Sequence, residues 1–167
     1  VMGRGRTFGE AFAKAALAAG WRLPEEGRVL LSFADRDKSR LPALAARFEE
    51  LGFGLLATEG TARLLRDAGF PDVQAVFKVG QGDPDIPHLL AEGGIDLVVN
   101  TAAGRKAARD APSIRRAALD AQVPYFTTIP GAYAAAEAVA TLRRGPLSVR
   151  ALQDDLAAKP PWAANLG

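Results

Sequence analysis

The sequence predicts an α/β fold with three layers, α/β/α, in which helices cover both faces of a five-stranded parallel sheet. Short apolar runs alternate with amphipathic helical patterns along the chain, and the runs are apolar on both faces. Strands of a parallel sheet have that composition because helices bury both of their faces. The 167 residues are enough for one domain with a real core and too few for two ordinary ones.

The elements follow from the period of the apolar residues. Continuous apolar runs predict strands at 28–33, 53–58, 73–79, 96–101 and 123–128. Apolar residues recurring every three or four positions predict helices at 7–19, 39–51, 60–69, 85–93, 112–121, 131–142 and 147–157.

Composition excludes several functions. The formal net charge is only +2, which makes nucleic acid a poor first hypothesis. Cysteine is absent and His88 is the single histidine, so thiolate and histidine-rich metal sites are excluded. No apolar run approaches the ~20 residues of a membrane span, and no signal peptide is visible. We therefore expect a soluble cytoplasmic domain without nucleic-acid or membrane partners.

Polar side chains follow the ends of the predicted strands. Ligands of open α/β sheets bind beyond the carboxyl ends of the strands, so we expect a binding site there. The hydroxyls, amide, lysines and glycine placed at this edge are Ser32, Lys38, Thr58, Gly60, Thr61, Lys78, Asn100 and Thr101, with Thr127 after the last strand.

The stretch TEGTA, residues 58–62, favours a phosphate site. It precedes a predicted helix, whose first N–H groups and dipole attract an anion. Gly60 allows close backbone approach, and Thr58 and Thr61 offer hydroxyl donors. Threonine is also an ordinary helix cap, and for this stretch alone that interpretation is equally good.

The sequence offers no convincing catalytic set and no metal site. His88 falls in a helical pattern, and no serine, histidine and aspartate triad assembles around it. Asp35, Asp37 and Asp83 lie in predicted loops on the correct side of the sheet, where one of them could in principle abstract a proton. We expect them instead to be solvated surface carboxylates.

Several motifs together resemble a known family. The segments VMGRGRTFGEAFAKA, DRDK, LLATEGTA, FKV, LVVNT, IRRAAL and YFTT are similar, in order and spacing, to the carboxyl-terminal regulatory domain of carbamoyl-phosphate synthetase large subunits. The resemblance implies the methylglyoxal synthase-like fold, a Rossmann-like sheet of order 3-2-1-4-5. It divides the chain into the end of a preceding synthetase unit or connecting helix (1–20), the regulatory domain (21–158) and a tail (159–167).

The resemblance also implies a function. Domains of this family are not catalytic and bind nucleoside monophosphate effectors, UMP as inhibitor and IMP as activator, through residues that match the strand-end set. The domain would need no cofactor. The parent would use ATP with Mg or Mn and would contain ATP-grasp domains and a small glutaminase subunit.

Ornithine is a further family effector. Thr127 matches the family's ornithine site, but Phe126 stands where an aspartate holds ornithine's amino group, and a phenyl ring cannot replace a carboxylate. Two other hypotheses remain. One is a phosphate-eliminating enzyme like methylglyoxal synthase, although the run SFADRDK lacks the histidine that this enzyme places after its first strand. The other is a domain that serves only self-association.

Overall fold

The computed structural model describes residues 1–101, 107–149, 151 and 153, with the backbone alone for 107–110. In chain order the elements are α1 (Phe8–Ala18), β1 (Arg28–Ser32), the 3-10 helix η1 (Asp35–Arg40), α2 (Leu41–Glu50), β2 (Gly54–Thr58), α3 (Glu59–Asp67), β3 (Gln74–Val76), α4 (Ile86–Ala91), β4 (Leu97–Asn100), α5 (Ala107–Asp120), β5 (Tyr125–Phe126) and α6 (Ile129–Leu142).

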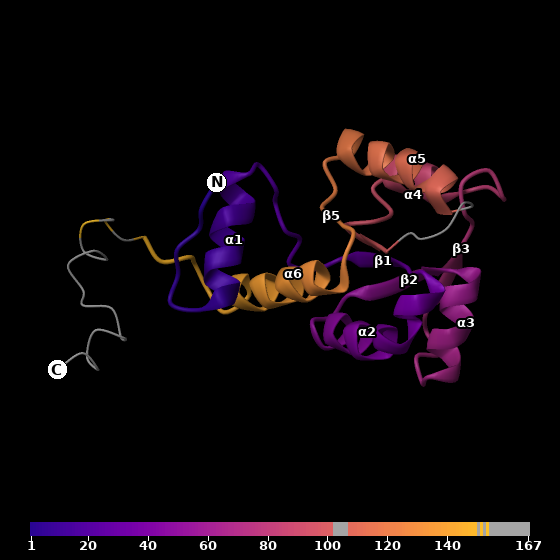
Figure 1. Cartoon of the computed structure of the whole chain (residues 1–167), viewed down its shortest axis with the longest axis horizontal. Coiled ribbons are helices and arrows are strands. Elements are labelled where there is room, and N and C mark those ends of the chain that lie inside the picture. The colour runs from indigo at the N-terminus through magenta and orange to yellow at the C-terminus, as the bar shows by residue number, and fades with distance from the viewer. Residues whose placement is uncertain (102–106, 150, 152, 154–167) are drawn as a thin grey trace.

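The five strands form one parallel sheet in the order β3-β2-β1-β4-β5, which confirms the predicted fold class. Helices α4 and α5 cover one face, and α2, α3 and α6 cover the other, so the three layers are visible from the side (Figure 1). The strands are apolar because both of their faces are buried, as the continuous apolar runs predicted.

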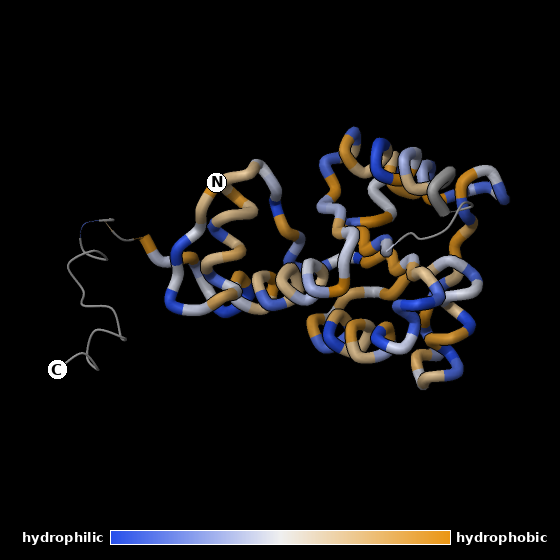
Figure 2. Tube along the Cα trace, in the orientation of Figure 1, coloured by the Kyte–Doolittle hydropathy of each residue, from blue (hydrophilic) through white to orange (hydrophobic). Residues whose placement is uncertain are grey.

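The sheet separates two apolar cores. Leu30, Leu56 and Val98 point to the α4/α5 face, where they pack with residues of those two helices. The alternate residues Leu31 and Val99 point to the opposite, larger core. The tube coloured by hydropathy shows apolar residues recurring along the strands and along the helices of both layers (Figure 2).

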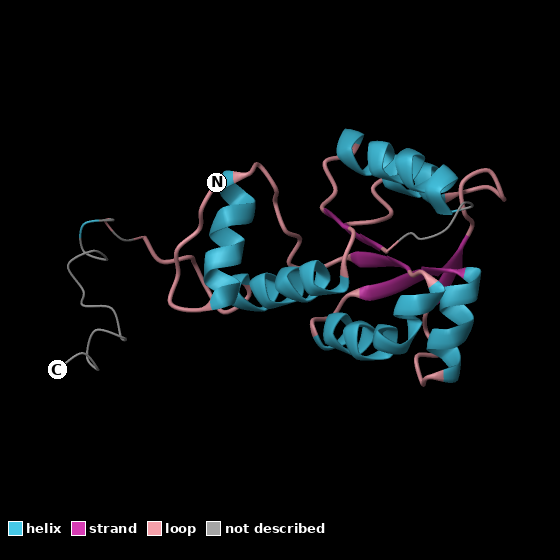
Figure 3. Cartoon of the chain, viewed as in Figure 1, coloured by secondary structure: helices cyan, strands magenta, loops and turns pink. Residues whose placement is uncertain are grey.

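Helix α1 packs on α6 at the side of the sheet (Figure 3). The contact is close at Gly9: a Cβ there would lie 2.4 Å from the Thr141 hydroxyl and 2.5 Å from the carbonyl oxygen of Glu137. Only glycine therefore allows the two helices to approach this far. Phe12 of α1 continues the contact toward β5, with its ring centroid 6.4 Å from that of Phe126.

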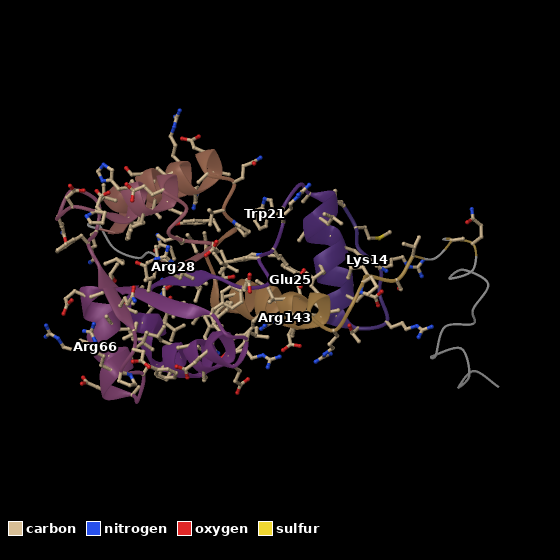
Figure 4. The ribbon with its side chains drawn as sticks, turned by 180° about the vertical axis from the view of Figure 1, so that it is seen from behind. Lys14, Trp21, Glu25, Arg28, Arg66 and Arg143 are labelled. Carbon is tan, nitrogen blue, oxygen red and sulfur yellow. The ribbon has the colours of Figure 1, made fainter. Side chains whose placement is uncertain are left out.

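Long side chains fasten the ends of the elements to one another (Figure 4). Arg143, at the end of α6, donates to the carbonyl of Leu51 at the end of α2. Arg66 of α3 donates to the carbonyl of Val73 before β3, at 3.0 Å. These bonds satisfy carbonyl groups where the chain turns out of regular structure.

The strand expected at 123–128 is shortened to β5, and the 3-10 helix η1 was not predicted. The structure differs from the predicted elements in three further places. The strand expected at 73–79 is only β3, because Phe77 pairs in a single bridge with Asp85 and the chain then turns at Gly80 (φ 67°). Helix α5 begins at Ala107, so Pro112 lies inside it and removes one N–H near its start.

The third difference concerns the helix expected at 147–157. Residues 147–149 are not helical, since Gly145 (φ 140°) and Pro146 end the preceding helix and Ser148 bonds to Glu10 of α1. Most of the remaining segment lies outside the described residues. In the described part of the chain, no helix has the length and apolar character needed to cross a membrane.

Candidate functional site

The carboxyl ends of β1 and β4 lie side by side at the point where the chain reverses its direction of winding. The chain leaves β1 through α2 on one face of the sheet and leaves β4 through α5 on the other. Ser32 and Asn100, the last residues of these strands, are direct partners in the sheet register. Such a topological switch point is where open α/β sheets bind small ligands.

Thr58 ends β2 at the same level and begins α3. It is at the N-cap position of α3, yet its side chain does not cap the helix. The Thr58 hydroxyl donates instead to the hydroxyl of Thr61, at 3.2 Å, and both side chains are buried. Gly60, in the first turn, has open space where a Cβ would stand. The simple capping interpretation of this stretch therefore does not describe the geometry of Thr58.

Both predicted lysines act on one carboxylate, that of Asp35, and Lys38 contacts it directly. Lys38 lies in η1 and not in a loop, with its ammonium 2.7 Å from the Asp35 carboxylate. Lys38 lowers the pKa of Asp35 through this hydrogen bond and its charge, and Lys78 adds a smaller effect in the same direction. Both cations therefore act at the same corner of the edge, although Lys78 is exposed after β3.

Asn100 is held by a residue that sequence reasoning did not select. Its amide nitrogen donates to the Tyr125 hydroxyl of β5 at 2.8 Å, and Asn100 is only 4% exposed. The guanidinium of Arg115 lies 5.6 Å from the centre of the Tyr125 ring, a cation–π contact. Burial raises the pKa of Tyr125, while the bond from Asn100 and the nearby Arg115 act in the opposite direction.

Thr101 has a visible structural task. Its hydroxyl accepts from the N–H of Ala34 at 3.1 Å, and its own N–H donates to the Ser32 carbonyl at 3.0 Å. These bonds hold the turn between β1 and η1 against the end of β4. Thr101 thus fixes the backbone at the ends of β1 and β4, and the residue itself is only 4% exposed.

Thr127 and Phe126, at the end of β5, face different surroundings. Thr127 is exposed. Phe126 is buried, with the Trp21 ring edge-on at 5.6 Å and the Phe12 ring at 6.4 Å between centroids. The phenyl ring therefore completes an aromatic cluster with α1 and the loop after it.

His88 and its neighbouring carboxylates lie near the end of β3. The imidazole Nδ1 of His88 is 3.0 Å from the Asp85 carboxylate and 3.8 Å from that of Asp83. Asp85 is the N-cap of α4 and also accepts from the N–H of Gly80. The His88 side chain is 65% exposed and that of Asp83 is 90% exposed, so water surrounds both.

The fold is that of a doubly wound α/β domain, with polar residues at the switch point between β1 and β4, where sheets of this kind bind small ligands. A family model described as the MGS-like domain matches residues 40–127. The chain belongs to this MGS-like family, and its sequence relatives identify it as an MGS-like domain of the carbamoyl phosphate synthase large-chain type.

Two relatives show how close the similarity is. The chain is 48% identical to the C-terminal section of the carbamoyl phosphate synthase large chain from Methanopyrus kandleri, over 92% of this chain and 28% of that protein. It is 49% identical to the carbamoyl phosphate synthase large chain from Rubrobacter xylanophilus, over 95% of this chain and 15% of that protein. The chain thus spans less than a third of the length of either relative.

A solved structure confirms the architecture. The crystal structure of methylglyoxal synthase from Elizabethkingia anophelis superposes with a TM-score of 0.51, covering 83% of this chain and 95% of that one. The two sequences are 18% identical, so the likeness establishes the fold.

Proposed function

We propose that this chain is the regulatory domain of a carbamoyl phosphate synthase large chain and that it binds nucleoside monophosphate effectors at the carboxyl edge of its sheet. UMP would inhibit and IMP would activate carbamoyl phosphate synthesis, the reaction that feeds pyrimidine and arginine pathways in the cytoplasm. The parent would combine this domain with ATP-grasp domains, which use ATP with Mg or Mn, and with a small glutaminase subunit.

The start of α3 is the observation that carries this proposal. A helix start that follows a strand presents N–H groups and a positive dipole end, and the Thr58 hydroxyl leaves them to another acceptor. A phosphate there would accept from the backbone near Gly60 and from the hydroxyls of Thr58 and Thr61. Lys38 and Lys78 would add charge, each well-placed charged hydrogen bond contributing about 1.5–3 kcal/mol.

The neighbouring strand ends suit the rest of a nucleotide. Ser32 and Asn100 are register partners beside β2, so a ligand whose phosphate lies at α3 would extend its ribose or base over β1 and β4. Hydroxyl and amide groups recognise such neutral polar edges by hydrogen bonds. We assign Ser32, Asn100 and Thr101 to this role. Ornithine would bind weakly or not at all, because Phe126 offers no carboxylate to its amino group.

Titration calorimetry with UMP and IMP tests the proposal. We expect saturable binding of at least one nucleotide at a single site, and Thr58→Ala should weaken it. A chain that binds neither nucleotide, with crystals that leave the edge empty after anion soaks, would contradict the assignment.

The second candidate is elimination of phosphate from a triose phosphate. The fold favours it, and so does the 3.8 Å distance between the His88 imidazole and the Asp83 carboxylate. Abstraction of a proton from carbon needs a base tuned by burial or by a neighbour, and groups that stabilise the enediolate. Asp83 lies in water, and His88 is mainly directed to the cap of α4. We therefore expect no turnover of dihydroxyacetone phosphate. Methylglyoxal production that Asp83→Asn abolishes would favour the enzyme instead.

A further inference from the structure

We propose that Asp35 is a built-in competitor of the effector phosphate: its carboxylate holds Lys38 in the free protein, and a phosphate monoester must displace it to bind. This inference rests on the proposed function, because it concerns the same corner of the sheet edge. It adds a residue that the nucleotide does not need and that lowers the apparent affinity of the site.

The geometry shows which member of the ion pair is able to leave. Lys38 and Asp35 are three residues apart in η1, with Nζ and Oδ1 2.7 Å apart. The Lys38 side chain is 29% exposed, whereas that of Asp35 is 94% exposed. The lysine is therefore packed in place, and the carboxylate can swing into water without breaking any packing.

Asp35 also occupies the electrostatic position that a phosphate would take. It lies against Lys38 and within the influence of Lys78, the two cations assigned to the phosphate. A singly charged carboxylate from solution gains little by displacing Asp35, because one carboxylate then only replaces another. A phosphate dianion brings a second charge and can engage Lys78 and the start of α3 as well.

The cost of displacement is the same for every ligand that approaches Lys38 with a phosphate. A tethered group on a short segment competes at an effective concentration in the millimolar range. Exposed ion pairs are weak, so removal of the Asp35 charge should tighten binding by about 1.4- to 5-fold. Because Asp35 meets only the phosphate end, inorganic phosphate and UMP should gain by the same factor.

The chain provides a matched control in the same 3-10 helix. Asp37 is an aspartate two residues later, and its carboxylate lies 3.6 Å from the guanidinium of Arg36. The carboxylate that pairs with Lys38 is that of Asp35. Asp37→Asn changes the net charge by the same amount as Asp35→Asn. A general effect of charge would therefore appear in both variants, and competition for Lys38 in one.

The experiment is calorimetric titration of the wild type, Asp35→Asn and Asp37→Asn with inorganic phosphate and with UMP, at one salt concentration. We expect Asp35→Asn to bind both ligands about 1.4- to 5-fold more tightly and Asp37→Asn to match the wild type. In a Lys38→Met background the gain from Asp35→Asn should disappear, and thermal melting checks that each variant is folded.

Two results would overturn the inference, and they are distinguishable. If the wild type binds UMP but Asp35→Asn binds it equally or more weakly, or if Asp37→Asn gains as much, Asp35 is no competitor and the proposed function stands. If the wild type binds none of inorganic phosphate, UMP and IMP, the proposed function fails and this inference fails with it.

Discussion

The starts of α3 and α6 have the same residue type at the N-cap position, but only one of these two side chains caps its helix. Both helices follow a strand and begin after a threonine, Thr58 or Thr128, in extended conformation. The Thr128 hydroxyl accepts from the N–H of Gly131 at 3.2 Å and caps α6. The Thr58 hydroxyl turns to Thr61 and does not cap α3. One threonine thus caps its helix, and the side chain of the other leaves the first N–H groups of its helix uncapped.

Helix α1 repeats the closed arrangement of α6. The Thr7 hydroxyl accepts from the N–H of Glu10 at 3.2 Å, and the Glu10 carboxylate accepts from the N–H of Arg6 at 2.7 Å. Sequence alone predicts a cap for all of these threonines, because the residue type and its spacing are alike. The difference lies in the geometry around each hydroxyl, and mutations can separate the two roles.

The largest effect should come from removing the charge of Lys38, which we assign to the phosphate. Lys38→Ala should weaken nucleotide binding by about 10- to 150-fold, the equivalent of about 1.5–3 kcal/mol for one charged hydrogen bond. The thermal transition should stay in place because the ion pair is at the surface. Lys14→Ala, which removes a lysine paired with Glu10 on α1, is the matched control and should leave nucleotide binding unchanged.

The exchange of threonines tests the comparison directly. Thr58→Ala should weaken nucleotide binding by about 2- to 12-fold, as expected for loss of a neutral hydrogen bond. Thr128→Ala should leave binding unchanged and destabilise the fold by about 1 kcal/mol, lowering Tm by about 2–4 °C. Calorimetry and thermal melting distinguish the two outcomes. Two variants that lose only stability would make both threonines simple caps.

Tyr125 sharpens the comparison on the sugar and base side. Tyr125→Phe removes the hydroxyl that holds Asn100, so nucleotide binding should weaken by about 2- to 12-fold while inorganic phosphate binding is unchanged. Tyr133→Phe, the other tyrosine of the chain, is the control and should change neither. An equal loss for phosphate and nucleotide would show that Tyr125 supports the fold and does not position Asn100.

The smallest effect concerns the closed start of α1. Bonds from Ser148 and Lys14 and from the Arg6 N–H lower the pKa of Glu10 to about 2, from an ordinary value of 4.5. A carboxyl whose pKa falls on folding stabilises the folded state above its ordinary value, and loses that contribution as the pH falls toward about 2. Glu10→Gln should therefore lower Tm at pH 7, and the difference from wild type should shrink between pH 4.5 and 2. A difference that stays constant over this range would contradict the role of the charge.

The fold was largely predictable because its strands are buried on both faces. Runs such as VLL before Ser32 and LVV before Asn100 allow few other structures, and the polar residue that follows each run marks the carboxyl edge, where such sheets bind ligands. The strand order needed the family resemblance, since periodicity carries no information on which strands are neighbours. The short edge strand β3 was overestimated because its end is decided by the loop that returns to Asp85.

Two parts of the site were missed, and one of them depends on a contact between distant segments. Tyr125 is an aromatic residue within an apolar run, and only the pairing of β5 with β4 brings its hydroxyl to Asn100. The pair of Lys38 and Asp35 is instead local, three residues apart, and was missed because the 3-10 helix η1 was not predicted between the first strand and the next helix. Only the partnership of Tyr125 with Asn100 is fixed by tertiary structure and has no signature in local sequence.

Strand β5 consists of two residues whose side chains leave the sheet in opposite directions. Tyr125 points toward the α4/α5 side and to Asn100, and Phe126 points to Phe12 of α1 and to Trp21. Because the two residues are consecutive in so short a strand, a rotation of the backbone that moves one of these side chains also moves the other. A rotation of α1 against the sheet would therefore be felt at Asn100 as a displaced hydroxyl, and a ligand that fixes Asn100 would resist that rotation.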